Sequence, residues 1–254
     1  SSGAVDSKWS ANDGKDPEFG NDSIYKKGWK DRPADWKDLK RLLKWDAMLT
    51  GAKTAAPHLE DATAAYQHFL YGGGDDFEFD FAEFIAEDSG GRSAYKDAVK
   101  EVTFAAVQWD DAMRMGPPEP GKSSAGGTQR SFSIESKPYN VGSSEENWTK
   151  AVGTFTMWIE AEVQVVEKDG KRQFSVQMRL NGYDFYNFNP GQEDVATGAR
   201  DAVNAELVVA GVGDEFNQSG TSDHQFGFEA TLGAAERQFV PSDKLVEFDQ
   251  RTGR

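Results

Sequence analysis

The sequence predicts an α+β protein in which a helical N-terminal half packs on an antiparallel β-sheet or half-barrel formed by the C-terminal half. Apolar residues recur every three or four positions before residue 115, and at alternate positions after residue 129. The 254 residues include 17 Phe and 7 Trp, so the chain can bury a large core. Helices followed by strands differ from the alternation that is typical of a parallel sheet.

Four helices are expected in a helical region spanning residues 32–115. Asp31 is a candidate cap for the first helix, and Pro33 fits its first turn. The Gly72–Gly74 run ends the second helix. The last helix is the longest, because residues 95–113 keep one face apolar over about five turns. The expected helices lie at about 31–51, 57–71, 80–87 and 93–113.

Three other segments of this half have a distinctive composition. Residues 1–31 are predicted to form an extended arm whose isolated aromatic residues, among them Trp9 and Phe19, dock onto the rest of the chain. Residues 116–128 are rich in Pro, Gly and Ser and predict a linker. The acidic and aromatic run Asp75–Phe84 is interpreted as a helix start whose phenylalanines pack inward.

A β-rich region is expected over residues 129–254, and it should share one core with the helices. Its clearest element is a hairpin, because residues 155–165 and 174–180 both alternate apolar and polar side chains. The turn signal Lys168–Lys171 lies between these two runs. The other elements expected here are strands at Glu206–Ala210 and Gln225–Leu232 and a short helix at Glu145–Val152, which carries Trp148.

Composition argues against several classes of function. Nucleic acids and anionic membrane surfaces bind clustered Lys and Arg, whereas this chain has a formal net charge of −15 and spreads its basic residues among carboxylates. The absence of cysteine excludes disulfides, cysteine-based zinc sites and thiol nucleophiles. No run of about 18 apolar residues occurs, so no membrane span is expected.

The expected location is extracellular or at the cell surface, with a cytoplasmic protein as the alternative. An acidic, cysteine-free chain with a Ser-Ser-Gly-Ala start is more typical of a mature exported protein than of a cytosolic one. A protein partner or a component of the cell envelope is the kind of partner expected there.

The familiar catalytic motifs are absent, including the Gly-x-Ser-x-Gly elbow, the Walker loop and the Gly-x-Gly-x-x-Gly turn. His58 and His68 are ten residues apart on one predicted helix, roughly 80° apart around its axis, which argues against a zinc site. His224 is a candidate general base beside Asp223. Its alternative interpretation is an exposed residue in a turn.

Residues 181–201 are the strongest candidate for a functional site, because aromatic, amide and carboxylate side chains crowd together directly after a predicted strand. If the strand continues through Asp184 and Tyr186, their side chains point to one face and that of Phe185 to the other. Asp184 and Tyr186 are therefore candidate catalytic residues, with Asp184 as a base or metal ligand.

The loop after this strand offers oxygen ligands and hydrogen-bonding groups. Asn187, Asn189 and Arg200 are candidate ligand-binding residues, and Asp194 and Asp201 are candidate metal ligands. Hard oxygen ligands of this kind suit calcium or magnesium. The alternative is a structural loop whose Asn, Asp and Thr side chains bond their own backbone, since the order differs from the Asp-x-Asn-x-Asp-Gly calcium pattern.

Three short motifs stand out, namely Asn147-Trp148-x-Lys150-Ala151-x-Gly153, then Tyr186-Asn187-Phe188-Asn189-x-Gly191-x-x-Asp194-x-Ala196-Thr197-Gly198, and Asp201-x-x-Asn204. These motifs resemble a family of functionally uncharacterised actinobacterial proteins, over roughly residues 35–230. The resemblance implies a coherent module and no particular activity.

A second resemblance concerns the four residues from Asp184 to Asn187. Their order, Asp-Phe-Tyr-Asn, is similar to the Asp-x-Tyr-Asp motif in the activity domain of colicin M-type bacteriocins. Members of that family cleave the lipid-linked precursor of peptidoglycan and carry His-Arg shortly after this motif. In this chain Asn187 replaces the second Asp, and no His-Arg pair follows.

Two functional hypotheses follow from these observations. The first is an exported, envelope-directed or toxin-like effector whose 181–201 loop supports metal-assisted hydrolysis of a phosphoester or pyrophosphate. The second is a non-catalytic binding or structural module of an exported assembly, in which the aromatic residues of the same segment are contact residues. The sequence leaves open whether the chain is an enzyme.

Overall fold

The computed structural model describes residues 6–20, 32–114, 129–168, 170–188 and 201–231. Within these residues the chain forms helices mainly before residue 115 and a seven-stranded sheet mainly after it, so the predicted α+β fold is confirmed. The helices are α1 (Trp36–Ala55), the 3-10 helix η1 (Pro57–Leu59), α2 (Glu60–Tyr71), α3 (Phe81–Glu87), α4 (Ser89–Arg114), α5 (Glu146–Ala151) and α6 (Asp201–Ala210).

The sheet is open, with strand order β1-β3-β5-β6-β7-β2, and β4 also pairs with β5. All described pairings are antiparallel except that of β2 with β7, which is parallel. The prediction of an antiparallel sheet is therefore correct apart from one short edge strand. The strands are β1 (Trp9–Ala11), β2 (Phe77–Glu78), β3 (Gln129–Ser136), β4 (Tyr139–Gly142), β5 (Thr154–Lys168), β6 (Lys171–Tyr186) and β7 (Phe216–Thr231).

The predicted hairpin is the centre of this sheet. Its register runs from Lys168 opposite Lys171 at the turn to Thr156 opposite Tyr183. β6 extends beyond the predicted strand as far as Tyr186, which lies opposite Phe216 of β7. Because side chains alternate along a strand, this extension sets which face of the sheet its last residues occupy.

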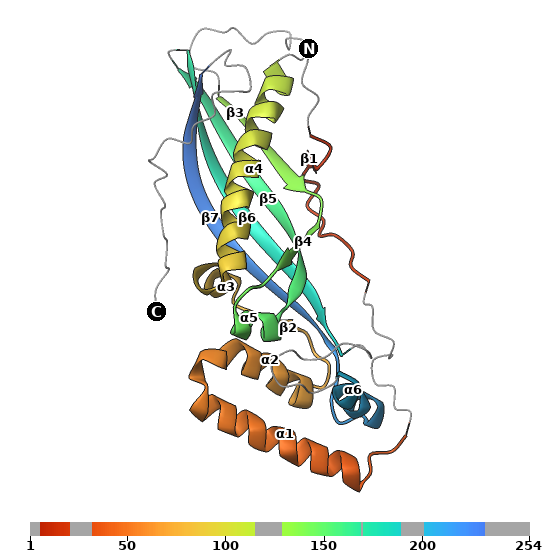
Figure 1. Ribbon diagram of the computed structural model, residues 1–254. Helices are drawn as coiled ribbons and strands as arrows, with labels where there is room; N and C mark the ends of the chain where they lie inside the picture. Colours follow the sequence, from red (N-terminus) through yellow and green to blue (C-terminus); the bar gives the residue numbers. More distant parts are fainter. Residues whose placement is uncertain (1–5, 21–31, 115–128, 169, 189–200, 232–254) are drawn as a thin grey trace.

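Helix α4 lies along one face of the sheet, across its central strands (Figure 1). Its inward residues are spaced three and four apart, so they share one side of the helix. They meet alternate residues of β5 and β6, such as Ile159 and Met178, in the first of two cores. The inward residues of α4 are Ala94, Ala98, Val102, Ala105 and Ala106.

Helices α1, α2 and α6 gather beyond one end of the sheet, and we call these three helices the helical cap (Figure 1). They form a second core in which Leu49, Phe69 and Leu207 surround Phe216 of β7. Phe77 packs against both cores. Apolar contacts are therefore continuous from α4 to the helical cap.

The sheet makes room for the segment before α3 at two glycines. Gly182 and Gly220 lie directly opposite each other on β6 and β7. A Cβ atom on Gly182 would lie 2.9 Å from the ring of Phe79, and one on Gly220 would lie 2.6 Å from the Phe79 carbonyl oxygen. Phe79 and Phe84 are buried, as predicted for this phenylalanine-rich helix start.

The segment Glu206–Ala210 is helical, so the prediction of a strand there was wrong. The apolar run Leu207-Val208-Val209 resembles a short buried strand, and β-branched residues favour strands. However, the buried residues Asn204, Leu207 and Val208 are three and four positions apart, which is a helical period. Packing of this face against the buried residues of α1 and α2 outweighs local propensity.

Helix α1 begins later than predicted, and Asp35 is its cap. The Asp35 carboxylate accepts hydrogen bonds from the backbone N–H groups of Lys37 and Asp38, and the Asp38 carboxylate accepts one from Asp35 N–H. This reciprocal arrangement is a capping box. The predicted cap, Asp31, lies outside the described residues, as does the predicted linker 116–128.

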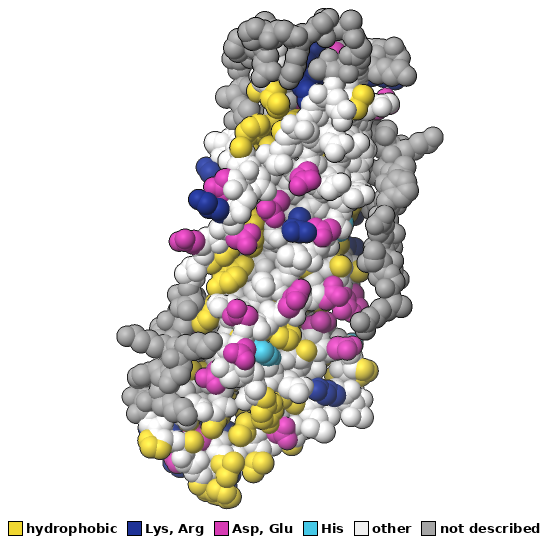
Figure 2. Space-filling model, turned by 180° about the vertical axis from the view of Figure 1, so that it is seen from behind, with side chains coloured by type: hydrophobic (Ala, Val, Ile, Leu, Met, Phe, Trp, Pro, Cys, Tyr) yellow, Lys and Arg dark blue, Asp and Glu magenta, His cyan; other side chains and the backbone are white. Residues whose placement is uncertain are grey.

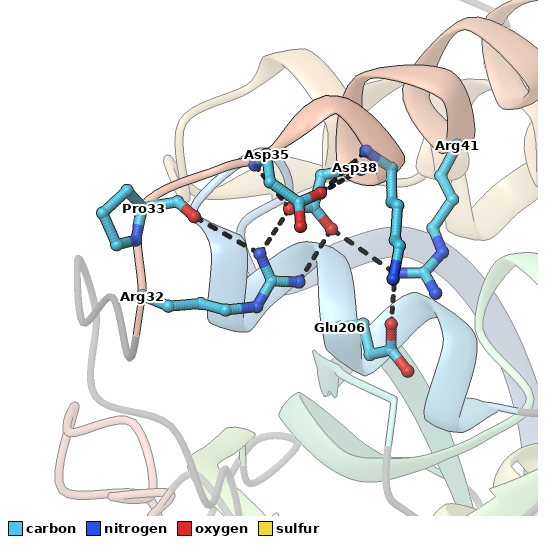
Figure 3. Close-up of polar contacts among 7 residues, drawn as sticks. Arg32, Pro33, Asp35, Asp38, Arg41 and Glu206 are labelled. Atoms are coloured by element: carbon cyan, nitrogen blue, oxygen red, sulfur yellow. Dashed lines mark hydrogen bonds and ion pairs between the residues drawn. The ribbon is translucent and has the colours of Figure 1, made fainter.

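Asp38 also links the start of α1 to α6 (Figure 3). This buried carboxylate accepts hydrogen bonds of 2.5 and 2.9 Å from Arg32, and Arg41 bridges Asp38 to Glu206. The hydrogen bond from Arg32 lowers the pKa of Asp38 despite its burial. Because the folded-state pKa lies below the unfolded one, the contribution of Asp38 to stability is present at neutral pH and is lost as the pH falls below about 4.

The described part of the N-terminal arm lies along the outer edge and outer face of the sheet. Trp9 is buried in β1, which pairs with β3. Phe19 stacks on Tyr183 with ring centres 4.5 Å apart, and it also contacts Trp158. The predicted docking of isolated aromatic residues is therefore observed for Trp9 and Phe19.

Candidate functional site

A pocket of about 790 Å³ lies between the helical cap and the neighbouring ends of β5 and β6. Its apolar wall comes from α1 and α2 and includes Trp45, Leu49 and Tyr66. The remaining wall comes from α5 and the strand ends, and includes Lys150 and Asp184. A cavity of this size and mixed lining suits a small ligand that has both an apolar and a polar part.

Asp184 lies near the end of β6 and lines this pocket. It is opposite Gln218 of β7, whose Nε2 donates a hydrogen bond of 2.7 Å to Asp184 Oδ2. The same Nε2 donates to the carbonyl oxygen of Ala151 at 3.1 Å. Because Gln218 is buried, it holds the Asp184 carboxylate in one orientation and connects the end of α5 to β7.

The amide orientation of Gln218 follows from its partners. Both the Asp184 carboxylate and the Ala151 carbonyl are acceptors, so the nitrogen of the amide must face them. Gln218 Oε1 is then buried and makes no hydrogen bond to the described protein atoms. A buried acceptor of this kind is usually satisfied by a donor from water or from a ligand.

Tyr186 connects the pocket to the second core. It lies two residues after Asp184 on the same face of β6, as predicted, and lines the pocket together with Asn187. Its ring stacks on Phe216 with centres 4.8 Å apart and meets the edge of Phe188 at 5.5 Å. The predicted roles of Tyr186 in catalysis and of Asn187 in ligand binding stay predictions.

His224 is half-buried in the middle of β7, so the interpretation as an exposed turn residue was wrong. It lies beneath α4, with ring centres 4.6 Å from Tyr95, and its Nε2 is 2.9 Å from Ser222 Oγ. Burial lowers the pKa of His224, and the nearby charge of Asp223 opposes this effect.

His224 and Asp184 do not meet in one site. His224 is six residues from Gln218, the partner of Asp184, which is roughly 20 Å along an extended strand. His224 does not line the pocket. Asp223 points to the other face of the sheet, where it pairs with Arg179 at 2.7 Å.

Several predicted site residues lie outside the described part of the chain. These are Asn189, Asp194 and Arg200. Asp201 is the first residue of α6, and its side chain is likewise not described. The ligand and metal roles of these four residues, and with them the binding of calcium or magnesium, stay predictions.

Among the described residues, one group of acidic side chains is close enough to share a metal ion: Asp61 of α2 with Glu83 and Glu87 of α3. Burial raises the pKa of both Asp61 and Glu83, and the neighbouring carboxylates raise them further. This group was not predicted from the sequence, because only folding brings the two helices together. His58 and His68 do not belong to it, and His68 Nε2 instead lies 2.7 Å from the Asp75 carbonyl oxygen.

Sequence reasoning also missed most of the pocket wall. Tyr66, whose hydroxyl donates a 2.8 Å hydrogen bond to Asn204, lies in the predicted helix 57–71 but was not predicted as a site residue. Gln218 was not predicted either, although a polar residue on the inward face of a strand is a sequence signal for a buried hydrogen-bonding role. Residues from all three motifs of the actinobacterial resemblance line the pocket, namely Lys150, Ala151, Gly153, Tyr186, Asn187, Phe188 and Asn204.

Within the described residues, no helix is both long enough and apolar enough to cross a membrane.

No protein-family model and no curated protein matches this sequence, so the resemblance to an actinobacterial family stays a prediction. Similar solved structures include PaeM, a colicin M-like bacteriocin produced by Pseudomonas aeruginosa, at 16% identity and a TM-score of 0.38. They also include the bacteriocin syringacin M from Pseudomonas syringae pv. tomato DC3000, at 16% identity and a TM-score of 0.36. The matches cover 68% and 67% of this chain, respectively.

This chain corresponds to about half of each bacteriocin, since the matches cover 52% of either structure. Both similarities are too low to assign an activity. What the fold and the pocket define is an α+β protein with a small-molecule-sized pocket at one end of its sheet.

Proposed function

We propose that this chain is a toxin-like effector that acts outside the cytoplasm, at the cell envelope, and hydrolyses a phosphoester or pyrophosphate bond in an amphiphilic substrate. The placement of Asp184 carries the proposal. Its carboxylate lines a partly apolar pocket and is held there by the buried amide of Gln218. The Asp184-x-Tyr186 pair, which resembles the colicin M-type motif, thus forms part of the pocket wall.

The two kinds of pocket wall suit the two parts of such a substrate. Trp45, Leu49 and Tyr66 offer apolar surface for a hydrocarbon chain. Lys150 offers a positive charge for a phosphate, which would compete with its present 2.9 Å ion pair to Glu146. The lipid-linked peptidoglycan precursor implied by the colicin M-type resemblance has both parts.

The proposed reaction needs a base and charge neutralisation. A water oxygen attacks the phosphorus atom, the bond from phosphorus to the leaving oxygen breaks, and a water proton passes to Asp184. A divalent cation, when bound, would neutralise the phosphate charge. Magnesium commonly uses one or two protein carboxylates together with substrate phosphates, and Glu146, the other carboxylate among the described pocket residues, would be its protein ligand while Asp184 acts as the base.

The Asp184→Asn variant tests this proposal. We expect the wild type to hydrolyse farnesyl pyrophosphate in the presence of magnesium. The rate of Asp184→Asn should be lower by a factor of at least about 100, because a positioned base contributes at least this factor. Phosphorus-31 NMR would follow the products. Asp97→Asn, an exposed carboxylate on α4, is the matched control and should retain the wild-type rate. An unchanged rate in Asp184→Asn would contradict the assignment of the base.

A non-catalytic binding module is the second candidate. The observation that favours it is Asn187, which stands where the colicin M-type motif has a second carboxylate and cannot act as a base. In this case the wild type would bind the same amphiphile in the pocket without releasing any product. Binding and hydrolysis measured on one preparation therefore separate the two candidates.

A further inference from the structure

Helix α1 has a second apolar face, which points away from the pocket. Trp36, Leu39 and Leu43 are 64%, 43% and 58% exposed. At about 100° per residue these three side chains lie within about 60° of one another, so they form one stripe. Trp45 and Leu49 lie on the other side of the helix, where they line the pocket.

Three lysines lie along one side of this stripe. Lys37, Lys40 and Lys44 are exposed, and on the same helical geometry they occupy the neighbouring arc. None of them forms an ion pair with a described residue, and Lys40 Nζ lies 5.3 Å from the centre of the Trp36 ring. An exposed apolar stripe beside a row of lysines is unusual on a chain whose net charge is −15.

We propose that this face of α1 docks the protein on an anionic membrane surface. Trp36, Leu39 and Leu43 would enter the headgroup region, where tryptophan is favoured, and the lysines would face lipid phosphates. The geometry fits a flat partner, because α1 is roughly 30 Å long and lies across one end of the molecule (Figure 1). Hydrophobic side chains also gather at this end in the space-filling view (Figure 2).

The overall negative charge does not prevent this docking. Interactions between exposed charges are largely screened beyond about 10 Å in salt of 0.1 M. Carboxylates on the distant sheet therefore contribute little to the electrostatic potential at the surface of α1. Each lysine near an anionic bilayer strengthens binding about fivefold. The acidic body would be repelled, which orients the molecule with α1 toward the membrane.

Docking through α1 would place the pocket next to the bilayer. Met48 of α1 is 40% exposed and also lines the pocket. An amphiphile held in the membrane could therefore reach the pocket past the same helix. This step rests on the proposed function, whereas membrane binding itself depends only on the α1 face.

Vesicle flotation tests the docking face. We expect the wild-type protein to float with vesicles of phosphatidylglycerol and phosphatidylcholine, and not with phosphatidylcholine vesicles. Lys37→Gln/Lys40→Gln/Lys44→Gln should weaken binding about 100-fold. Leu39→Glu/Leu43→Glu should abolish it, while Phe104→Glu, which changes a residue 43% exposed on α4, should bind normally. Circular dichroism would verify that each variant is folded.

Three results would overturn the proposal: no binding by the wild type, equal binding to both kinds of vesicle, or normal binding by Leu39→Glu/Leu43→Glu. If the wild type did not bind vesicles but formed a dimer, and Leu39→Glu/Leu43→Glu dissociated that dimer, the α1 face would instead be assigned to contact with a second copy of the chain. Hydrolysis of farnesyl pyrophosphate without vesicles is independent of α1 docking, so failure of either proposal can be recognised separately.

Discussion

Replacing Asp110 by alanine is expected to lower the free energy of unfolding by about 3–5 kcal/mol, since it removes the buried carboxylate that two largely buried arginines share. Asp110 is a buried residue near the end of α4. Its carboxylate accepts hydrogen bonds of 2.5 and 3.1 Å from Arg130 of β3 and of 2.9 Å from Arg172 of β6. Arg172 is itself only 4% exposed and also pairs with Asp111, while Arg130 also pairs with Glu167.

Urea denaturation of the wild type and Asp110→Ala would measure this loss. The matched control is Asp223→Ala, which removes an exposed ion pair to Arg179 and should cost at most about 1 kcal/mol. If both variants lost the same small amount of unfolding free energy, Asp110 would not be the residue that holds α4 on the sheet.

Asp88→Ala is expected to cost about 3 kcal/mol and to disturb the pocket. Asp88 is buried directly before α4, and its Oδ1 accepts the backbone N–H groups of Gly90 and Gly91 at 2.7 and 3.1 Å. Its Oδ2 accepts those of Ser144 and Glu145, before α5, at 2.9 and 2.7 Å. The variant therefore loses a helix cap, worth about 1–2 kcal/mol, and leaves further N–H groups without their acceptor.

The control for Asp88→Ala is Asp80→Ala, because Asp80 caps α3 through one exposed hydrogen bond to Glu83 N–H. We expect Asp80→Ala to cost about 1 kcal/mol. Asp88→Ala should also weaken ligand binding, since Ser144 lines the pocket, whereas Asp80→Ala should not. Equal losses of stability in the two variants would mean that the link to α5 contributes nothing.

Long periodic segments were the part of the fold that the sequence could predict. The hairpin of β5 and β6 and the helix α4 each repeat one period over many residues, so several turns or pleats agree on one face. Short segments contain too few residues to define a period. β1 spans Trp9–Ala11 and is defined by its pairing with β3, which no local pattern reveals. α6 was mistaken for a strand because its few apolar residues fit both periods.

The candidate site was predictable only along one strand. Alternation predicted that Asp184 and Tyr186 share a face, and the structure agrees. The residue that orients Asp184 is Gln218, which is 34 positions away and reaches it through strand pairing. The apolar wall around Trp45 comes from a helix more than a hundred residues earlier, so it required the three-dimensional arrangement of the cap.

The central claim is that the pocket beside Asp184 holds an amphiphilic ligand, and a binding titration tests it most directly. Isothermal titration calorimetry with farnesyl pyrophosphate and magnesium should show saturable binding of one ligand per chain. Leu59→Trp, which narrows the pocket, should weaken binding at least about tenfold, or 1.4 kcal/mol. Met113→Trp, an exposed position on α4 outside the pocket, should bind like the wild type. Absence of saturable binding, or equal binding by Leu59→Trp and the wild type, would contradict the assignment of this pocket as the functional site.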